Sequence, residues 1–255
     1  CMMKRLFDLF FSTVGLLLLF PLFLCVSVFI RLDSRGPVFF RQKRLGRGLY
    51  PFSIYKFRTM VEDADLRGPL ITMDGNKRVT RVGRMLRKTK IDELPQLINV
   101  FKGEMSLVGP RPEVEKYVLL YKEDYQEILK ARPGVTDLAS ILFRDEETLL
   151  LQEDNPEAYY EQILLPQKIK LAKEYLQKSS ILYDVGLIFL TFFRIFFKGK
   201  TQMKSGCAYN ILHLISSGGL FGAERVLIEI AEGMQSDTCR VTVGVIETAQ
   251  NRHLG

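Results

Sequence analysis

The chain has 255 residues, a formal net charge of +7, and a composition that is 47% hydrophobic and 25% charged. That length fits one large domain or two small ones. The composition excludes a disordered or collagen-like chain. It also excludes a transporter with many membrane spans, because a charged quarter could not all lie outside lipid. Four cysteines without paired spacing and only two histidines argue against a disulfide scaffold or a zinc site and favour a reducing compartment.

The N-terminal region carries a long apolar segment. From Leu6 to Ile30 the sequence holds a single charged residue, Asp8. At about 1.5 Å per residue, a helix of this length could reach across a hydrocarbon layer of about 30 Å. The segment is too long for a cleaved signal peptide, and no small-x-small cleavage site follows it. Pro21 lacks a backbone donor and clashes with the preceding turn, so it predicts a break or kink in the helix.

Basic residues flank this segment on both sides. Lys4 and Arg5 precede it, and a basic run from Arg31 to Arg47 follows it. Positive residues usually stay on the cytoplasmic side of a membrane, so both ends are expected there. We therefore predict a re-entrant helical hairpin, over about residues 4–31, that enters one leaflet and returns. A kinked single-span anchor is the alternative.

Positive charge is concentrated directly after the apolar segment. Residues 31–60 hold eight basic side chains and one acidic side chain. Beside a membrane segment, such a patch predicts contact with the headgroups of cytoplasmic-membrane lipids, where each cation contributes about 1 kcal/mol. No nucleic-acid-binding motif accompanies the patch, so nucleic acid is not a predicted partner.

The remaining pattern predicts a mostly helical domain with one small β-hairpin. Aromatic and β-branched residues around a turn at Gly46–Gly48 predict the hairpin. A loop is expected over residues 103–112, and the apolar stretch 181–198 is expected to lie in the membrane interface, because the distance between its charges is too short for a span. Helical periodicity and start signals predict helices over residues 78–87, 92–101, 113–131 and 156–178, with Asp92 as the N-cap of the second.

Asp92 and Glu93 form an acidic pair at the expected start of a helix. One interpretation is structural: an N-cap followed by an acid that the helix dipole favours. The other is chemical, because a carboxylate can attack phosphorus to give an acyl phosphate and adjacent carboxylates suit Mg²⁺. Several cationic side chains near the pair in sequence predict an anion site: Arg84, Arg87, Lys88, Lys90, Arg111 and Arg132.

Four strings together resemble a known family: FDLFFSTVGLLLLFP, KFRTM, KTKIDELPQLINVFKGEMSLVGPRP and ARPGVT. Over about residues 3–198 the chain resembles the bacterial sugar transferases, in particular the small monotopic polyprenyl-phosphate phosphoglycosyl transferases. The resemblance implies an α+β protein on the cytoplasmic face of the bacterial inner membrane, with a helix break at Phe20–Pro21. It implies transfer of a sugar 1-phosphate from a UDP-sugar to undecaprenyl phosphate, with Mg²⁺ and release of UMP, as the first membrane step of surface-glycan assembly.

The resemblance also implies roles for single residues. Asp92 would be the nucleophile of a covalent phosphosugar-aspartate, Glu93 its partner, and both would be Mg²⁺ ligands. The family often continues ARPGVT with Gly, whereas Asp137 stands there in this chain, and an acid at this position is expected to alter acceptor or sugar contacts. The predicted substrate-binding residues are Arg87, Arg111, Arg132, Lys56 and Arg58.

The C-terminal region has a different pattern. Residues 199–208 read as a polar linker, and residues 209–255 read as strand, glycine turn, helix and strand, with Gly218, Gly219 and Gly222 in the turn. This βαβ fragment resembles the opening of a two-Rossmann-domain glycosyltransferase. One such unit is too small to bury a core of its own, so we predict no second glycosyltransferase activity. The fragment is expected to be a remnant or part of a longer fused polypeptide.

Two other function classes stay open at this point. One is a membrane-anchored conventional glycosyltransferase that uses the glycine turn at 218–222. The other is a non-catalytic membrane scaffold that recruits later glycosyltransferases through the C-terminal fragment. The nucleotide product separates the three, because the phosphoglycosyl reaction releases UMP, a conventional transfer releases UDP, and a scaffold releases neither.

Overall fold

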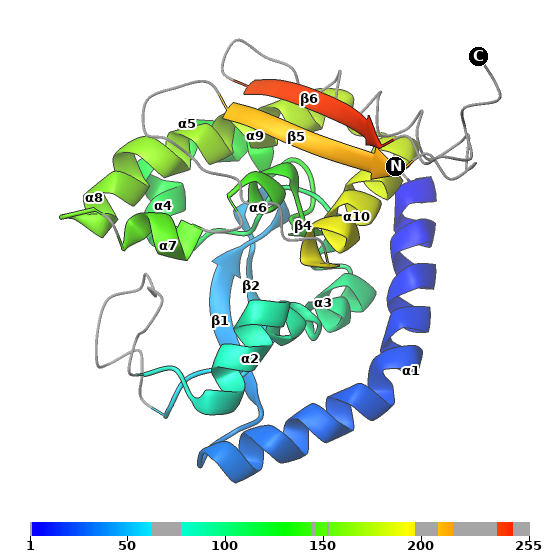
Figure 1. The fold of residues 1–255 in the computed structure, drawn as a ribbon, viewed down its shortest axis with the longest axis vertical. Coiled ribbons are helices and arrows are strands. Elements are labelled where there is room, and N and C mark those ends of the chain that lie inside the picture. Colours follow the sequence, from blue (N-terminus) through cyan, green and yellow to red (C-terminus); the bar gives the residue numbers. More distant parts are fainter. Residues whose placement is uncertain are drawn as a thin grey trace. The chain divides into compact units, whose positions relative to one another are not determined.

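The structure is a computed structural model that describes residues 2–62, 78–143, 146–151, 153–196, 209–216 and 239–246. They belong to two units, Cys1–Ile181 and Leu182–Gly255. The first unit is mostly helical (Figure 1). Its helices are α1 (Met2–Asp33), α2 (Arg81–Thr89), α3 (Gln96–Lys102), α4 (Glu115–Leu120), α5 (Lys122–Ile128), α6 (Leu138–Leu142), α7 (Glu146–Leu150), α8 (Pro156–Tyr159) and α9 (Leu165–Lys178). Its strands are β1 (Phe39–Leu45), β2 (Pro51–Phe57), β3 (Ser106–Val108) and β4 (Gly134–Thr136), and its shorter turns are η1 (Arg47–Leu49), η3 (Ile91–Glu93) and the π-helix η4 (Tyr160–Leu164).

Helix α1 is one continuous element of 32 residues that contains Pro21. Its ribbon changes direction near the middle (Figure 1), as expected for an internal proline. Among the described helices, α1 is the one long and apolar enough to span a membrane, and only 11% of its most apolar 18-residue window is buried. An exposed apolar helix of this kind is unlike a core helix of a water-soluble protein. The proline kink predicted from the sequence is thus present, within an unbroken helix.

Both halves of α1 pack against the same unit. In the first half the buried Asp8 accepts hydrogen bonds from Ser106 Oγ and the Leu107 backbone nitrogen, both at 3.0 Å. In the second half Phe23, Val26 and Ile30 form a buried apolar cluster with Phe57 of β2 and Leu86 of α2. The bent helix therefore packs on β2, β3 and α2, of which β2 and α2 also contact the turn η3 that holds the acidic pair.

The β-hairpin is confirmed. β1 and β2 pair antiparallel, with Phe39 opposite Phe57 and Leu45 opposite Pro51. The turn between them includes Gly48 at φ 68°, a left-handed conformation that glycine adopts without steric cost. The hairpin holds Lys56 near the end of β2, facing the acidic pair described below.

The predicted helix over residues 92–101 is shorter than expected. Asp92 lies in η3, and α3 begins only at Gln96, after Pro95, without a side-chain cap. The expectation that Asp92 is an N-cap is therefore wrong. Pro95 explains the late start, because its ring fixes φ and its missing N–H suits the entry to a helix.

The predicted loop over residues 103–112 contains a strand. β3 pairs parallel with β4, with Ser106 opposite Gly134. The backbone just after β3 lies very close to the backbone of β4. A Cβ atom on Gly134 would lie 2.0 Å from the backbone nitrogen of Gly109. Glycine at these two positions is what permits the approach, and it places the turn after β3 next to β4.

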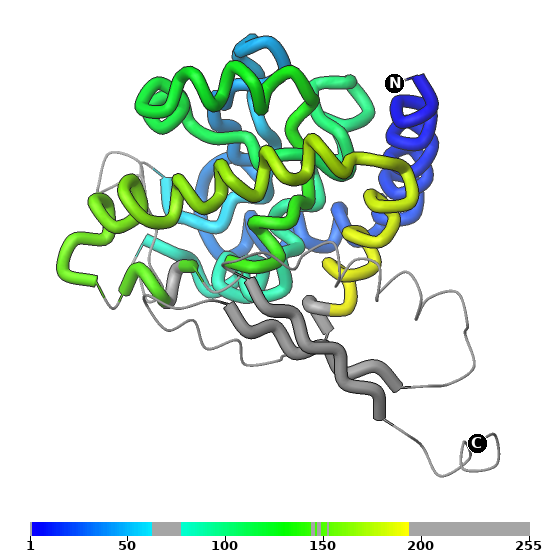
Figure 2. The backbone as a smooth tube through the Cα atoms, turned by 90° about the horizontal axis from the view of Figure 1, so that it is seen from above, coloured from blue at the N-terminus to red at the C-terminus, as the bar shows by residue number. Residues whose placement is uncertain are grey.

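The helical stretches after this turn are also more divided than predicted. The expected helix over 113–131 is two short helices, α4 and α5, and that over 156–178 is α8, η4 and α9. The longest of these, α9, packs on α5 and α6 and can be followed across the view in Figure 2. Together they enclose a buried polar region behind the acidic pair.

The second unit contains α10 (Ile181–Phe196), β5 (Tyr209–Ser216) and β6 (Cys239–Ile246). β5 and β6 pair parallel from Tyr209 opposite Cys239 to Ser216 opposite Ile246. Parallel neighbours need a crossover connection, which agrees with the predicted βαβ order. The predicted linker, glycine turn and intervening helix lie outside the described residues.

Candidate active site

Asp92 and Glu93 lie in η3, the single turn between α2 and α3. The side chain of Asp92 is buried, with 8% of the residue exposed. Its Oδ1 atom accepts no hydrogen bond from any residue in the described part of the chain. Buried polar atoms are nearly always hydrogen-bonded, so this oxygen is available for a ligand or for chemistry.

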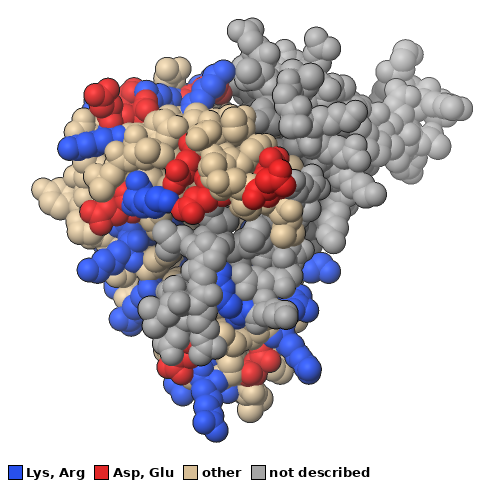
Figure 3. Space-filling view, turned by 90° about the vertical axis from the view of Figure 1, so that its left-hand side faces the viewer, with Lys and Arg blue, Asp and Glu red and all other residues tan. Residues whose placement is uncertain are grey.

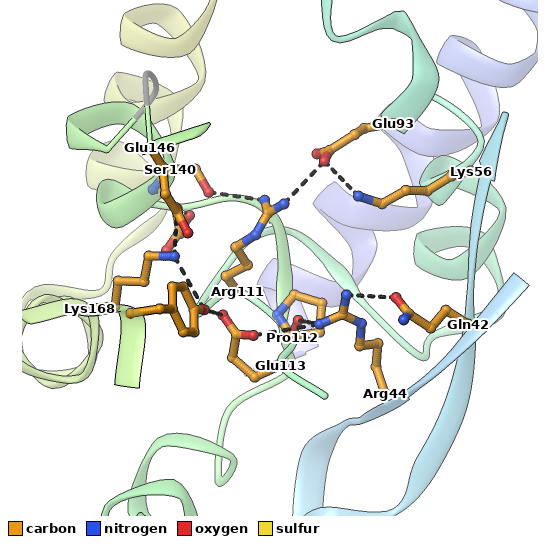
Figure 4. A network of polar contacts seen from close by, with 12 residues as sticks. Gln42, Arg44, Lys56, Glu93, Arg111, Pro112, Glu113, Ser140, Glu146 and Lys168 are labelled. Atoms are coloured by element: carbon orange, nitrogen blue, oxygen red, sulfur yellow. Dashed lines mark hydrogen bonds and ion pairs between the residues drawn. The ribbon is translucent and has the colours of Figure 1, made fainter. Parts of the chain in front are cut away.

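Glu93, in contrast, is held by two cations. Its Oε1 atom lies 2.8 Å from Lys56 Nζ and 3.2 Å from Arg111 NH2. Arg111 comes from the Pro-Arg-Pro turn after β3, and its other terminal nitrogen donates to Ser140 Oγ at 3.2 Å. Figure 4 shows Lys56 and Arg111 reaching Glu93 from opposite sides. Residues far apart in the chain thus fix the orientation of one acid of the pair.

Asn99 joins the elements on which these residues lie. It is fully buried; its Oδ1 accepts from the Tyr55 backbone nitrogen at 3.0 Å, and its Nδ2 donates to Ser53 O and Glu104 Oε2, each at 2.7 Å. These bonds tie β2 to α3, so Lys56 on the strand keeps its position relative to Glu93. Sequence reasoning missed Asn99, because an asparagine in a helix carries no signal of its distant partners.

The two acids differ in their pKa values. Burial raises the pKa of Asp92 to about 6, and the charge of Glu93 adds to this effect, while Lys56, Lys90 and Arg87 oppose it. Burial also acts to raise the pKa of Glu93, but Lys56, Arg111 and Lys90 hold it well below its usual range. The pair therefore carries its first negative charge on Glu93 and its second on Asp92.

The sequence predicted that the start of a helix would favour the ionised form of Asp92. In the structure, the pKa of Asp92 is controlled mainly by burial instead. Asp92 precedes α3 within its own short turn, and desolvation outweighs the nearby cations. At neutral pH the carboxylate is still the major form, since a group with a pKa of about 6 is mostly ionised one unit above it. A desolvated, ionised carboxylate is a suitable nucleophile.

The other predicted substrate-binding residues are distributed differently. Arg87 Nε donates to Thr59 Oγ1 at 3.0 Å, and its charge acts on Asp92, so Arg87 belongs to the surroundings of the pair. Arg58, directly after β2, instead extends its side chain to the end of α1, where its NH2 donates to Ser34 O at 2.6 Å. Arg132 Nε donates to Gly103 O at 2.9 Å, after the last turn of α3.

A second polar cluster continues from Arg111 into the protein (Figure 4). Glu113, two residues after Arg111, forms an ion pair with Arg44 and accepts a hydrogen bond from the Tyr160 hydroxyl. Lys168 lies on the far side of Tyr160 and pairs with Glu146 at 2.6 Å. Sequence reasoning did not include this cluster, whose members come from β1, α7, η4, α9 and the turn after β3.

A metal site can be tested on the donor atoms present. In the part of the chain that the structure describes, no three or more His, Cys, Asp or Glu side chains are grouped to hold a metal ion. The site offers the unpartnered Oδ1 of Asp92 and the neighbouring Glu93. This set does not fit an all-protein cage, but it fits Mg²⁺, which commonly binds one or two carboxylates together with substrate phosphates and water.

The predicted basic patch is partly exposed. Five of its eight cations lie on the surface, namely Arg31, Arg35, Arg41, Lys43 and Arg47. The other three, Arg44, Lys56 and Arg58, are engaged in the contacts given above, with Glu113, Glu93 and Ser34 respectively. In the view of Figure 3, Lys and Arg gather in the lower part, whereas Asp and Glu are more frequent in the upper part. The exposed part of the patch remains suited to anionic headgroups.

Comparison with known proteins identifies the family. Residues 1–198 match the bacterial sugar transferases. The chain belongs to this family. The acidic pair, the Pro-Arg-Pro turn and the bent apolar helix all lie inside the matched region.

Three relatives illustrate the match. One is a UDP-N-acetylgalactosamine-undecaprenyl-phosphate N-acetylgalactosaminephosphotransferase of Aeromonas hydrophila, 43% identical over 144 residues, which are 54% of this chain and 34% of the relative. An undecaprenyl-phosphate glucose phosphotransferase of Komagataeibacter xylinus is 42% identical over 201 residues, or 76% of this chain and 36% of the relative. The exopolysaccharide production protein ExoY of Sinorhizobium fredii is 33% identical over 203 residues, which are 74% of this chain and 83% of the relative. The chain thus spans about a third of the length of the first two.

Proposed function

We propose that this chain transfers a sugar 1-phosphate from a UDP-sugar to undecaprenyl phosphate and releases UMP. Two of the relatives are named as undecaprenyl-phosphate sugar phosphotransferases, and the name of one of them includes the UDP-sugar UDP-N-acetylgalactosamine. The observation that carries the proposal is the buried Asp92 oxygen, which has no hydrogen-bond partner in the described part of the chain, next to an acid that two cations hold in place. This arrangement provides one free carboxylate for bond formation and one fixed carboxylate for orientation.

In the first step, an oxygen of the Asp92 carboxylate attacks the phosphorus that bears the sugar. The bond between that phosphorus and the bridging oxygen breaks, and UMP leaves with the bridging oxygen. An acyl phosphate between Asp92 and the phosphosugar remains. Burial leaves Asp92 poorly solvated, so little water must be removed from the nucleophile before it attacks.

In the second step, a phosphate oxygen of undecaprenyl phosphate attacks the same phosphorus. The bond to Asp92 breaks, which restores the carboxylate and gives undecaprenyl-diphosphate-sugar. Two steps allow a water-soluble donor and a lipid acceptor to use one site in turn. A conventional one-step transfer would need both substrates in the site together.

The cations around the pair serve different parts of this chemistry. Lys56 and Arg111 keep Glu93 ionised and oriented, and Arg111 has a fork geometry that also suits phosphate oxygens. Arg87, placed beside the pair by its bond to Thr59, adds positive charge where the diphosphate would lie. Asp92 and Glu93 would hold Mg²⁺ together with the donor, and the bound ion would neutralise the charge of the diphosphate.

The contacts of α1 support the re-entrant topology. Near its start, Lys4 Nζ donates to Val108 O at 2.9 Å and Arg5 NH1 to Val100 O at 2.6 Å. At its end, Asp33 Oδ2 accepts from the Val82 backbone nitrogen at 2.9 Å. Both ends are thus bound to one polar unit, which cannot lie on both sides of a bilayer. A straight span would have to break one of these sets of contacts.

This topology would place the site on the cytoplasmic face of the inner membrane, at the level where a polyprenyl phosphate headgroup lies. The exposed apolar side chains of α1 would contact lipid, among them Leu17, Leu18, Phe20 and Leu24. The exposed basic side chains after α1 would meet the headgroups. A lipid acceptor could then reach Asp92 without leaving the membrane.

The proposal is tested with purified protein in lipid, Mg²⁺, undecaprenyl phosphate and UDP-N-acetylgalactosamine or UDP-glucose. UMP release with formation of a lipid-linked diphosphosugar supports it. Intact-mass analysis with donor alone should reveal a phosphosugar adduct on the protein that Asp92→Asn abolishes. Release of UDP would favour conventional glycosyl transfer instead. Release of neither nucleotide from any donor of a UDP-sugar panel would contradict the proposal.

A further inference from the structure

The second polar cluster behind Arg111 is centred on Tyr160. Its hydroxyl donates to Glu113 Oε1 at 3.0 Å and accepts from Lys168 Nζ at 3.4 Å. Lys168 also lies 4.6 Å from the centre of the Tyr160 ring. Tyr160 opens the π-helix η4, a rare helical form that is frequent at functional sites. The hydroxyl is thus fixed from two sides in a buried position that the chemistry above does not use.

Glu113 connects this hydroxyl to the Pro110–Pro112 turn that presents Arg111. Its Oε2 lies 3.5 Å from Arg44 NH1, and the same nitrogen donates to the Pro112 carbonyl at 3.3 Å. The Glu113 carbonyl further accepts from the Leu45 backbone nitrogen at 3.3 Å. One end of the turn is therefore clamped by Glu113 and Arg44, while Arg111 itself reaches Glu93.

We propose that Tyr160 is a positioning residue for Arg111, acting through Glu113 and the clamped turn. The hydroxyl fixes the Glu113 carboxylate, which in turn fixes Arg44 against the carbonyl of Pro112. Without the hydroxyl, Glu113 can rotate, and the turn can carry the guanidinium of Arg111 away from Glu93. The expected effect of Tyr160 on catalysis rests on the proposed function. Its expected effect on the position of Arg111 is independent of that function.

The charges around Tyr160 are consistent with a permanent donor. Burial and the neighbouring Glu113 raise the pKa of Tyr160 well above 10, and the charge of Glu146 adds to this. Lys168 faces the ring and pairs with Glu146. The hydroxyl therefore keeps its proton at neutral pH and can donate it to Glu113.

Tyr117 offers a matched control. Its ring lies 4.8 Å from that of Tyr160, and it is as deeply buried. Its hydroxyl, however, has no hydrogen-bond partner among the described residues. Tyr117→Phe and Tyr160→Phe thus remove the same atom from neighbouring rings, but only the second removes a link to Glu113.

The first test measures UMP release for the wild type, Tyr160→Phe and Tyr117→Phe at neutral pH. We expect kcat of Tyr160→Phe to fall on the order of tenfold, because Arg111 is no longer held in place beside Glu93. Tyr117→Phe should match the wild type; equal losses in both variants, or no loss in either, would overturn the proposal.

The second test does not depend on the reaction. Phenylglyoxal modifies accessible arginines, and peptide mass spectrometry gives the rate at each position. Modification of Arg111 should be several times faster in Tyr160→Phe than in the wild type or in Tyr117→Phe, and Glu113→Gln should have the same effect should Tyr160→Phe fail to fold. Unchanged Arg111 reactivity in both variants overturns the proposal. If the wild type releases no UMP, the proposed function fails, and this rate alone decides the role of Tyr160.

Discussion

The two ends of α3 both attract cationic side chains, but to different partners. At the C-terminal end, Arg5 donates to Val100 O, and Arg132 donates to Gly103 O. The last carbonyls of a helix have no partner within the helix, and cations there also meet the negative end of its dipole. At this end, the arginines add charge-assisted hydrogen bonds to backbone carbonyls.

The N-terminal end is different. There Lys56 and Arg111 meet a carboxylate, Glu93, rather than carbonyls, and the buried oxygen of Asp92 beside them has no hydrogen-bond partner among the residues that the structure describes. α3 has seven residues, so the two ends are about 10 Å apart. The comparison teaches that a cation near the acidic pair favours chemistry where it meets a carboxylate beside a buried unsatisfied oxygen, and a structural role where it meets a backbone carbonyl.

The largest effect on activity is expected from replacing Asp92 at the N-terminal end of α3. Asp92→Asn should lower kcat by at least about 10³-fold, because an amide cannot form the acyl phosphate, and the covalent adduct should disappear from the intact mass. Asp154→Asn is the matched control, since Asp154 is exposed and outside the site. An Asp92→Asn enzyme that releases UMP at the wild-type rate would remove the nucleophile from the mechanism.

The second prediction compares the two ends of α3 by replacing one arginine at each. Arg111→Met should lower kcat/KM by about 10²-fold, as removal of a stabilising donor does in other active sites. Arg132→Met should instead lower the melting temperature by about 5 °C, because a charge-assisted hydrogen bond contributes about 1.5–3 kcal/mol. Donor-dependent UMP release and thermal unfolding of both variants provide the comparison.

Arg132 is the more informative of the two. It was predicted from the sequence as a substrate-binding residue, and its position after α3 favours a structural role. A raised KM for the donor in Arg132→Met, with an unchanged melting temperature, would support substrate binding by Arg132 and contradict the difference between the two ends. A lower melting temperature with a loss of kcat/KM below tenfold would support a structural role for Arg132.

The sequence predicts those parts of the site that are local in the chain or carried by motifs. Asp92 and Glu93 are adjacent, and the strings around Lys56 and Arg111 are long and ordered, so their association could be expected. The partners of Arg58 and Arg132 could not, because each is a backbone carbonyl exposed by the end of a helix. A sequence indicates that a cation is present but not which helix end it meets.

The same limit applies to the fold. The β-hairpin was predictable because its strands are separated by a short glycine turn. The pairing of β3 with β4 was not, because strands of three residues give no periodicity and their register depends on the close approach of Gly109 and Gly134. The contact between Tyr160 and Glu113 spans 47 positions of sequence and was missed for the same reason.

The pH profile tests the division of charge within the acidic pair. Asp92 must be ionised to attack phosphorus, and its pKa of about 6 means that the active fraction falls as the pH decreases through that value. kcat/KM at pH 5 should be about tenfold below its plateau. Lys56→Met should move this limb to higher pH, because Lys56 lowers the pKa of both acids. A limb near pH 4 would mean that burial does not control Asp92.

The smallest expected effect concerns Asp137, where the family often has glycine. Its Oδ1 accepts from the Ser140 backbone nitrogen at 2.9 Å and caps α6, and replacing a cap by glycine costs only a few tenths of a kcal/mol. Ser140 in turn accepts from Arg111, so the cap lies one contact behind the pair. Asp137→Gly should therefore change the free energy of unfolding by less than about 1 kcal/mol, measured by urea denaturation at pH 7, and leave kcat/KM within about threefold of the wild type.

The difference in unfolding free energy between the wild type and Asp137→Gly should depend on pH in one direction. Burial raises the pKa of Asp137 in the folded state, so the folded wild type holds this proton more tightly than the unfolded chain does. The wild type therefore loses stability, relative to Asp137→Gly, as the pH rises from the unfolded pKa through the folded one. The variant should be closest to the wild type at pH 7 and furthest below it at acid pH. A change of donor preference in a panel of UDP-sugars, with stability unchanged, would instead place Asp137 in contact with the sugar, as expected from its departure from the family.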